Sequence, residues 1–112
     1  GGRRSAAVES AAAQAAALGH RLEQLDRSIR LEVTARHLDV ETARSAVDVA
    51  ESGVIAAREN LDVASDRHRE GLIPSSERLD AEVQLLRAGL DRATALARLR
   101  VAQAQLARAL GN

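Results

Sequence analysis

The stretch RHREGLIPSSERLDA, residues 67–81, breaks an otherwise continuous helical pattern. It holds Gly71, two apolar residues, Pro74 (the single proline of the chain) and then two serines. Glycine readily adopts the left-handed backbone that ends a helix, and proline disfavours helical backbone at the residue before it. The stretch therefore predicts a tip turn at residues 71–75.

The segments on either side of this turn are predicted to be long helices. No proline and only two glycines occur between Ser5 and the turn. After the turn, Ser75 is a candidate N-cap, and Glu77 suits the positive end of a helix dipole. We therefore expect residues 1–112 to form a single all-α domain, a long antiparallel helical hairpin, with helices at 5–70 and 76–110. At about 1.5 Å per residue, the first arm is about twice as long as the second.

Both helices carry two apolar stripes with alternating spacings of three and four, so each helix needs neighbours on two sides. The first helix has one stripe at Val40, Ala43, Val47, Ala50, Val54, Ala57, Leu61, Ala64 and His68, and another at Leu31, Ala35, Leu38, Ala46, Val49, Ala56 and Val63. The second helix has one at Leu79, Val83, Leu86, Leu90, Ala93, Ala97, Arg100, Ala104 and Ala107, and another at Ala81, Leu85, Ala88, Leu96, Leu99, Ala102 and Leu106.

The first stripe of each helix fits the other as an antiparallel contact line, which we call the seam. In this register Ala57 faces Leu90, so that a small residue meets a large one and the helices can approach closely. The register predicts the centre of the turn at Ile73–Pro74. Arg100 is then the one charged residue in the seam of the second helix.

The first 35 residues have no partner in this hairpin, although Leu18, Leu22, Leu25 and Ile29 form an apolar line that favours burial. Either Gly19 ends the helix and a third segment folds back, or another copy or a segment outside this sequence covers the line. We prefer the second, because nothing around Gly19 resembles a turn. The absence of methionine leads us to expect a cleaved leader or an excised fragment.

Composition excludes several functions. The chain has 46% hydrophobic residues, no aromatic residue, no cysteine and zero net charge. Acidic residues alternate with the arginines, so no basic stripe indicates a nucleic-acid partner, and stacking on aromatic rings is impossible. No apolar run approaches the ~20 residues of a membrane-spanning helix.

Side chains capable of chemistry do not form a recognisable catalytic or metal site. The histidines His20, His37 and His68 lack the spacing of metal ligands, and no Gly-rich phosphate loop is present. Ser75, His68 and Asp80 have the residue types of a catalytic triad, but a two-helix coil offers neither a pocket nor an oxyanion hole. We therefore predict no enzymatic activity and no cofactor. Glu77 and Asp80, one helical turn apart, would by themselves be solvated acids at a helix start.

The residues DRHREGLIPSSERLDAEVQLLRAGL (66–90) and AQAQLARALG (102–111) resemble the outer-membrane efflux protein family, the TolC-like ducts. The tip pattern of that family is R-Y-x-x-G-h-x-x-x-x-D-h-h-x-A, where h is apolar. The chain departs from the family at His68, Pro74, Glu77 and Arg78. The matching positions are Arg67, Gly71, Leu72, Leu79, Asp80, Ala81, Leu85 or Leu86, Ala88 and Ala109-Leu110-Gly111.

This resemblance implies a role in passive export from a Gram-negative bacterium. The hairpin would be a wall segment of an α-barrel on the periplasmic side of the outer membrane, built from three subunits. The chain would meet the membrane only through a β-barrel outside this sequence. The tip, residues Gly71, Leu72, Ile73, Pro74 and Ser75, would dock on a periplasmic adaptor and, through it, on an inner-membrane pump. Glu77 and Asp80 would be acids at the pore mouth.

Two alternatives remain open at this point. The hairpin of the periplasmic adaptor itself also has a glycine-containing tip followed by a serine. Its pattern, R-x-x-x-L-x-x-x-x-x-x-S, does not fit when counted back from either Ser75 or Ser76. A generic structural coiled coil is the second alternative, although it would not need the Gly-Leu-Ile-Pro turn.

Overall fold

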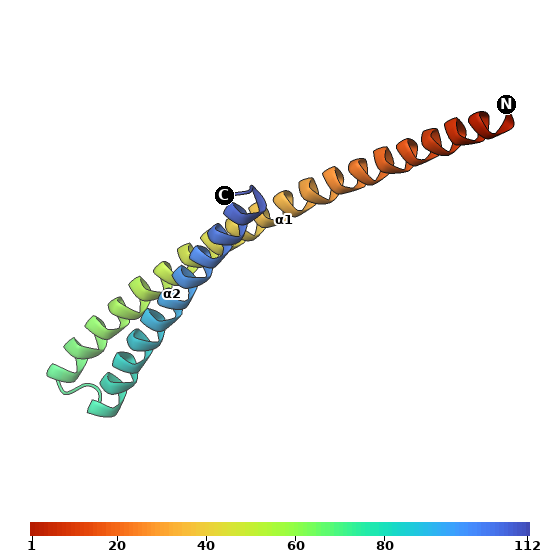
Figure 1. Ribbon diagram of the computed structural model, residues 1–112. Coiled ribbons are helices and arrows are strands. Elements are labelled where there is room, and N and C mark those ends of the chain that lie inside the picture. The colour runs from red at the N-terminus through yellow and green to blue at the C-terminus, as the bar shows by residue number, and fades with distance from the viewer. The chain divides into compact units, whose positions relative to one another are not determined.

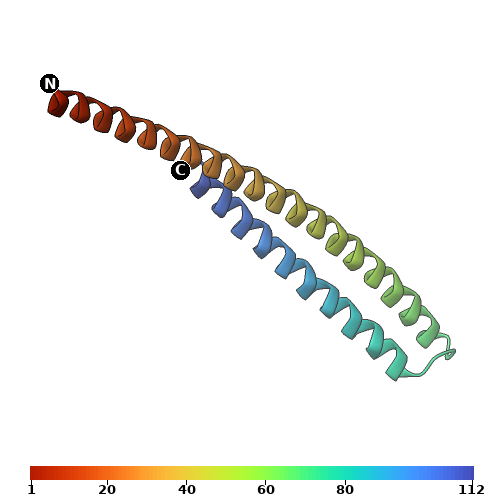
Figure 2. The same ribbon diagram turned by 90° about the vertical axis from the view of Figure 1, so that its right-hand side faces the viewer.

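The chain, described over residues 1–112 by a computed structural model, folds into two helices and contains no strand. Helix α1 spans Gly2–Arg69 and has 68 residues, and helix α2 spans Ser75–Ala109 and has 35 residues. Helix α2 turns back and runs antiparallel along the C-terminal part of α1 (Figures 1 and 2). This confirms the expected all-α hairpin with a longer first arm.

The chain divides into two units, residues Gly1–Ala35 and Arg36–Asn112. The first unit is the N-terminal part of α1. Gly19 lies within the helix, so the alternative in which it ends the helix and a third segment folds back is wrong. Leu18, Leu22, Leu25 and Ile29 are all exposed. The second unit contains the hairpin.

Glycine ends both helices in the same way. Gly71 has a φ of +75°; its N–H donates to the carbonyl of His68 at 3.0 Å, and the N–H of Leu72 donates to that of Arg67 at 2.9 Å. This pair of hydrogen bonds is the Schellman motif, in which the left-handed residue satisfies the last free carbonyls of the helix. Gly111, with a φ of +85°, ends α2 with an equivalent pair of bonds.

The start of α2 differs from the expectation. Pro74, not Ser75, occupies the N-cap position, with φ −73° and ψ 162° and no side-chain capping bond. Its carbonyl accepts the N–H of Glu77 at 3.1 Å, and Ser75 is the first residue of the helix. The prediction of a serine cap was wrong because the proline ring already holds φ near the value needed at the start of a helix.

Burial confirms the predicted seam on α1. Val40, Val47 and Ala57 are buried, and the residues between and beyond them at the predicted positions are half-buried. The alternative stripe of α1, which includes Leu31, Leu38 and Val49, is exposed.

Burial contradicts the predicted seam on α2. Leu79, Val83, Leu86 and Leu90 are between 45% and 66% exposed. The other apolar stripe contacts α1 instead: its Ala102 is buried, and Ala95 is buried in place of the predicted Leu96, which is half-buried. The seam of α2 thus consists of Ala81, Leu85, Ala88, Ala95, Leu99, Ala102 and Leu106.

Two polar contacts between the helices set the register. Arg36 Nη1 lies 3.4 Å from Gln105 Oε1, and Arg92 Nε lies 3.9 Å from Glu51 Oε1. For each pair, the point halfway along the sequence between the two residues lies beside Gly71. The prediction had placed this point at Ile73–Pro74. The predicted register is therefore wrong by several residues.

The observed register still places large residues against small ones. Between the two polar contacts, Val47 comes opposite Ala95, and both are buried. One turn further from the tip, Ala43 comes opposite Leu99. Because each of these layers joins one alanine to one larger residue, the helices can approach closely.

Candidate functional site at the hairpin tip

The turn between the helices presents an apolar side chain on a well-defined backbone. The Schellman bonds fix Gly71 and Leu72, and Pro74 fixes the entry into α2. Leu72 is nevertheless 68% exposed, whereas Ile73 is half-buried and the other tip residues are exposed. In a Schellman motif the residue after the left-handed position often packs back on the helix. Leu72 does not, and so it is available for contact.

Glu77 and Asp80 lie in the first turns of α2, and both are exposed. Neither carboxylate takes part in an ion pair, whereas nearby Asp66 pairs with Arg69 and Glu82 pairs with Arg78. The unpaired acids therefore give this part of the tip a local negative charge, partly balanced by the positive end of the α2 dipole.

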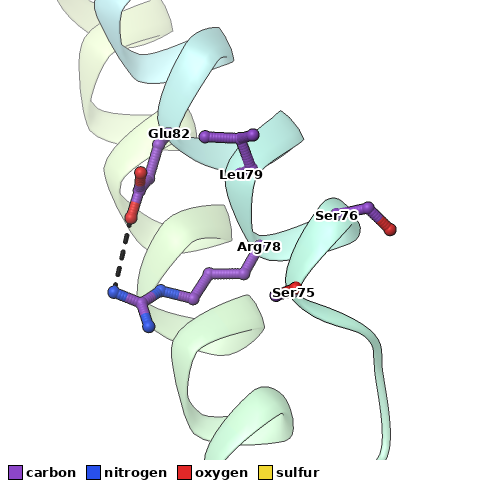
Figure 3. A pocket seen from close by; sticks show the side chains of 5 residues that line it. All are labelled: Ser75, Ser76, Arg78, Leu79 and Glu82. Carbon is purple, nitrogen blue, oxygen red and sulfur yellow. Dashed lines mark ion pairs between the residues drawn. The ribbon is translucent and has the colours of Figure 1, made fainter.

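A shallow hollow lies on another side of α2 beside the turn (Figure 3). Arg78 reaches across it, and its Nη2 atom lies 3.4 Å from Glu82 Oε1. The hollow was not expected from the sequence, although its residues have the spacing of one helix face. They are Ser75, Ser76, Arg78, Leu79 and Glu82.

The remaining candidate groups stay apart. His20 and His37 are exposed, and His68 is half-buried in the seam at its tip end. No side-chain hydrogen bond joins His68 to Ser75 or Asp80, and no group of three or more acidic or histidine side chains is placed to hold a metal. The arrangement offers surfaces for contact and for ions rather than a reaction centre.

The full length of the sequence, residues 1–112, matches the family described as outer membrane efflux protein. The chain belongs to this family. Members of this family are efflux channel proteins of the outer membrane, and the family is not an enzyme family. No curated protein and no solved structure matches the chain.

Neither α1 nor α2 contains a stretch with the length and apolarity of a membrane-spanning helix. Family membership also favours the duct over the two alternatives, the adaptor hairpin and the generic coiled coil.

Proposed function

We propose that this chain forms part of the periplasmic wall of a passive export duct in a Gram-negative bacterium. The duct accepts substrates through a periplasmic adaptor and an inner-membrane pump, and it needs no cofactor. The observation that carries the docking role is Leu72, an exposed apolar side chain on a turn held by backbone hydrogen bonds. A rigid apolar anchor loses little conformational entropy on binding, so it favours a specific contact.

The two apolar faces of α2 support its place in a wall. The seam of α2 faces α1, and an exposed apolar line lies on the opposite side of the helix. This line consists of Leu79, Val83, Leu86 and Leu90. A helix with apolar lines on opposite sides fits between two neighbours in one layer of helices. In our proposal, helices from three subunits form one such layer, and this layer closes on itself to make the duct.

Glu77 and Asp80 are proposed to line the mouth of this duct. They are exposed, lack ion-pair partners and lie one helical turn apart beside the docking turn. A ring of carboxylates from several copies attracts cations and repels anions.

Docking can be tested by placing a photo-activated cross-linking amino acid at Leu72 in the full-length protein in cells. We expect a covalent adduct with the periplasmic adaptor. The matched control is the same amino acid at Leu110, an exposed leucine beside the glycine that ends α2, where we expect no adduct. An adduct at Leu110 but not at Leu72 would contradict tip docking.

The role of the mouth acids can be tested by replacing Glu77 and Asp80 together with alanine. We expect the potassium-to-chloride permeability ratio of the reconstituted channel to fall, by about three-fold or more at low salt, because the carboxylates no longer attract cations. The reversal potential in a salt gradient measures this ratio. An unchanged ratio would mean that the two acids are only solvated residues at a helix start.

A further inference from the structure

A line of polar side chains runs along α2 immediately beside the seam. All but one of its members directly precede a seam residue, and the exception, Asp91, lies one helical turn from both Arg87 and Thr94, so the line follows one side of the seam as far as Arg98. It begins at the mouth with Asp80 and continues through Gln84, Arg87, Asp91, Thr94 and Arg98. We call these six residues the polar line.

Two shallow grooves between the helices open on the side of the polar line. From α2 they are lined by members of the polar line, from Gln84 to Arg98. From α1 they are lined only by uncharged residues, among them Ala46, Gly53 and Ala56. No carboxylate of α1 therefore faces the arginines of this side.

The small residues indicate which side of the hairpin faces inward in a curved wall. The concave side of a cylinder has the smaller circumference, so side chains there must occupy less width than those on the convex side. On the side of the polar line, α1 contributes mostly alanine and glycine, with Val49 and Asn60 as the larger residues. On the other side the groove is lined by larger residues of α1, Glu51, Ile55 and Arg58. The contrast on α1 favours the side of the polar line as the concave, inner side.

The charges along the polar line change sign with depth. Asp80, with Glu77 nearby, makes the mouth negative, whereas Arg87 and Arg98 outnumber Asp91 further in. Both arginines are exposed, and neither takes part in an ion pair. Asp80 and Arg87 are about 10 Å apart along the helix axis, close to the Debye length at 0.1 M salt, so the two zones do not fully cancel one another.

We propose that Arg87 and Arg98 form an anion-favouring zone inside the duct, behind the acidic mouth. This inference rests on the proposed duct function. Rings of arginine attract anions in the same way that rings of carboxylate attract cations. Because Asp91 offsets only one of the two arginines, each copy of the chain adds net positive charge to this zone.

The test uses the full-length protein in planar bilayers, with reversal potentials measured in a potassium chloride gradient near 0.01 M, where the Debye length is about 30 Å and screening is weak. We expect the double variant Arg87→Gln and Arg98→Gln to lower the chloride-to-potassium permeability ratio about two-fold or more. The matched control is Arg100→Gln, which removes an exposed arginine that follows a seam residue and so lies on the other side of α2. We expect the control to leave the ratio unchanged.

Two results would overturn the inference: an unchanged ratio in the double variant, or an equal fall in the Arg100→Gln control. Failure of the proposed docking is read separately, from the cross-linking at Leu72. An adaptor adduct at Leu72 together with an unchanged ratio would remove only the anion zone. A lowered ratio without any adduct would keep the anion zone and remove the docking of the tip.

Discussion

The Leu72→Asp variant of the full-length protein is expected to lose export almost completely while still assembling in the outer membrane. Leu72 is exposed, so aspartate there does not disturb the packing of the hairpin. At a docked interface, however, the same change buries an unpaired charge where an apolar anchor was. The loss is expected to be about 2 kcal/mol or more, which is roughly a thirty-fold weaker contact. Growth in the presence of an exported toxic compound measures the effect.

Leu72→Met is the matched control, since it keeps an apolar side chain of similar size at the tip. We expect near-normal export from it. Leu72 is a better target than Gly71, because the positive φ of Gly71 strains any other side chain and would alter the turn itself. Normal export by the Leu72→Asp variant, with the protein present in the membrane, would exclude docking through this residue.

The second large effect is expected for Ala95→Asp, which places a carboxylate in the seam between the helices. Ala95 is only 9% exposed and comes opposite Val47, so a carboxylate there loses much of its hydration and disrupts an apolar contact between the helices. We expect the 112-residue chain to lose about 3 kcal/mol of stability. Thermal unfolding followed by circular dichroism would measure the loss.

Ala93→Asp is the matched control for this experiment. Ala93 is exposed in the chain and belongs to the line that the sequence wrongly predicted as the seam. Both changes carry the same cost in helix propensity, about 0.7 kcal/mol, so the difference between them reports burial alone. Equal unfolding temperatures, or a greater loss for Ala93→Asp, would restore the predicted register.

The turn and its residues were predictable because local chemistry decides them. Gly71 accepts the left-handed backbone, and Pro74 cannot continue a preceding helix. The same locality placed Glu77 and Asp80 one turn apart and exposed. The hollow of Arg78, Leu79 and Glu82 was not predicted, because helical spacing shows that these residues share one face but not how their side chains are placed on it.

The seam of α2 was not predictable because both apolar lines of that helix satisfy the same local criteria. Each line combines large apolar residues with alanines at spacings of three and four, from Leu79 to Ala107 on one and from Ala81 to Leu106 on the other. Each line permits an antiparallel register against α1 with large residues opposite small ones. Periodicity identifies apolar faces, but it does not say which neighbour covers them.

Local sequence is enough to predict the two helices, the place where the chain reverses and the two apolar faces on each arm. These follow from backbone preferences and from the 3.6-residue period, which act over a few residues. The face of α2 that meets α1, and hence the register, becomes evident only in the folded hairpin. The contacts Arg36–Gln105 and Glu51–Arg92 between the helices show this register. The reason is that the pairing depends on how far α2 is rotated about its own axis after the turn at Gly71. No local residue preference encodes this rotation.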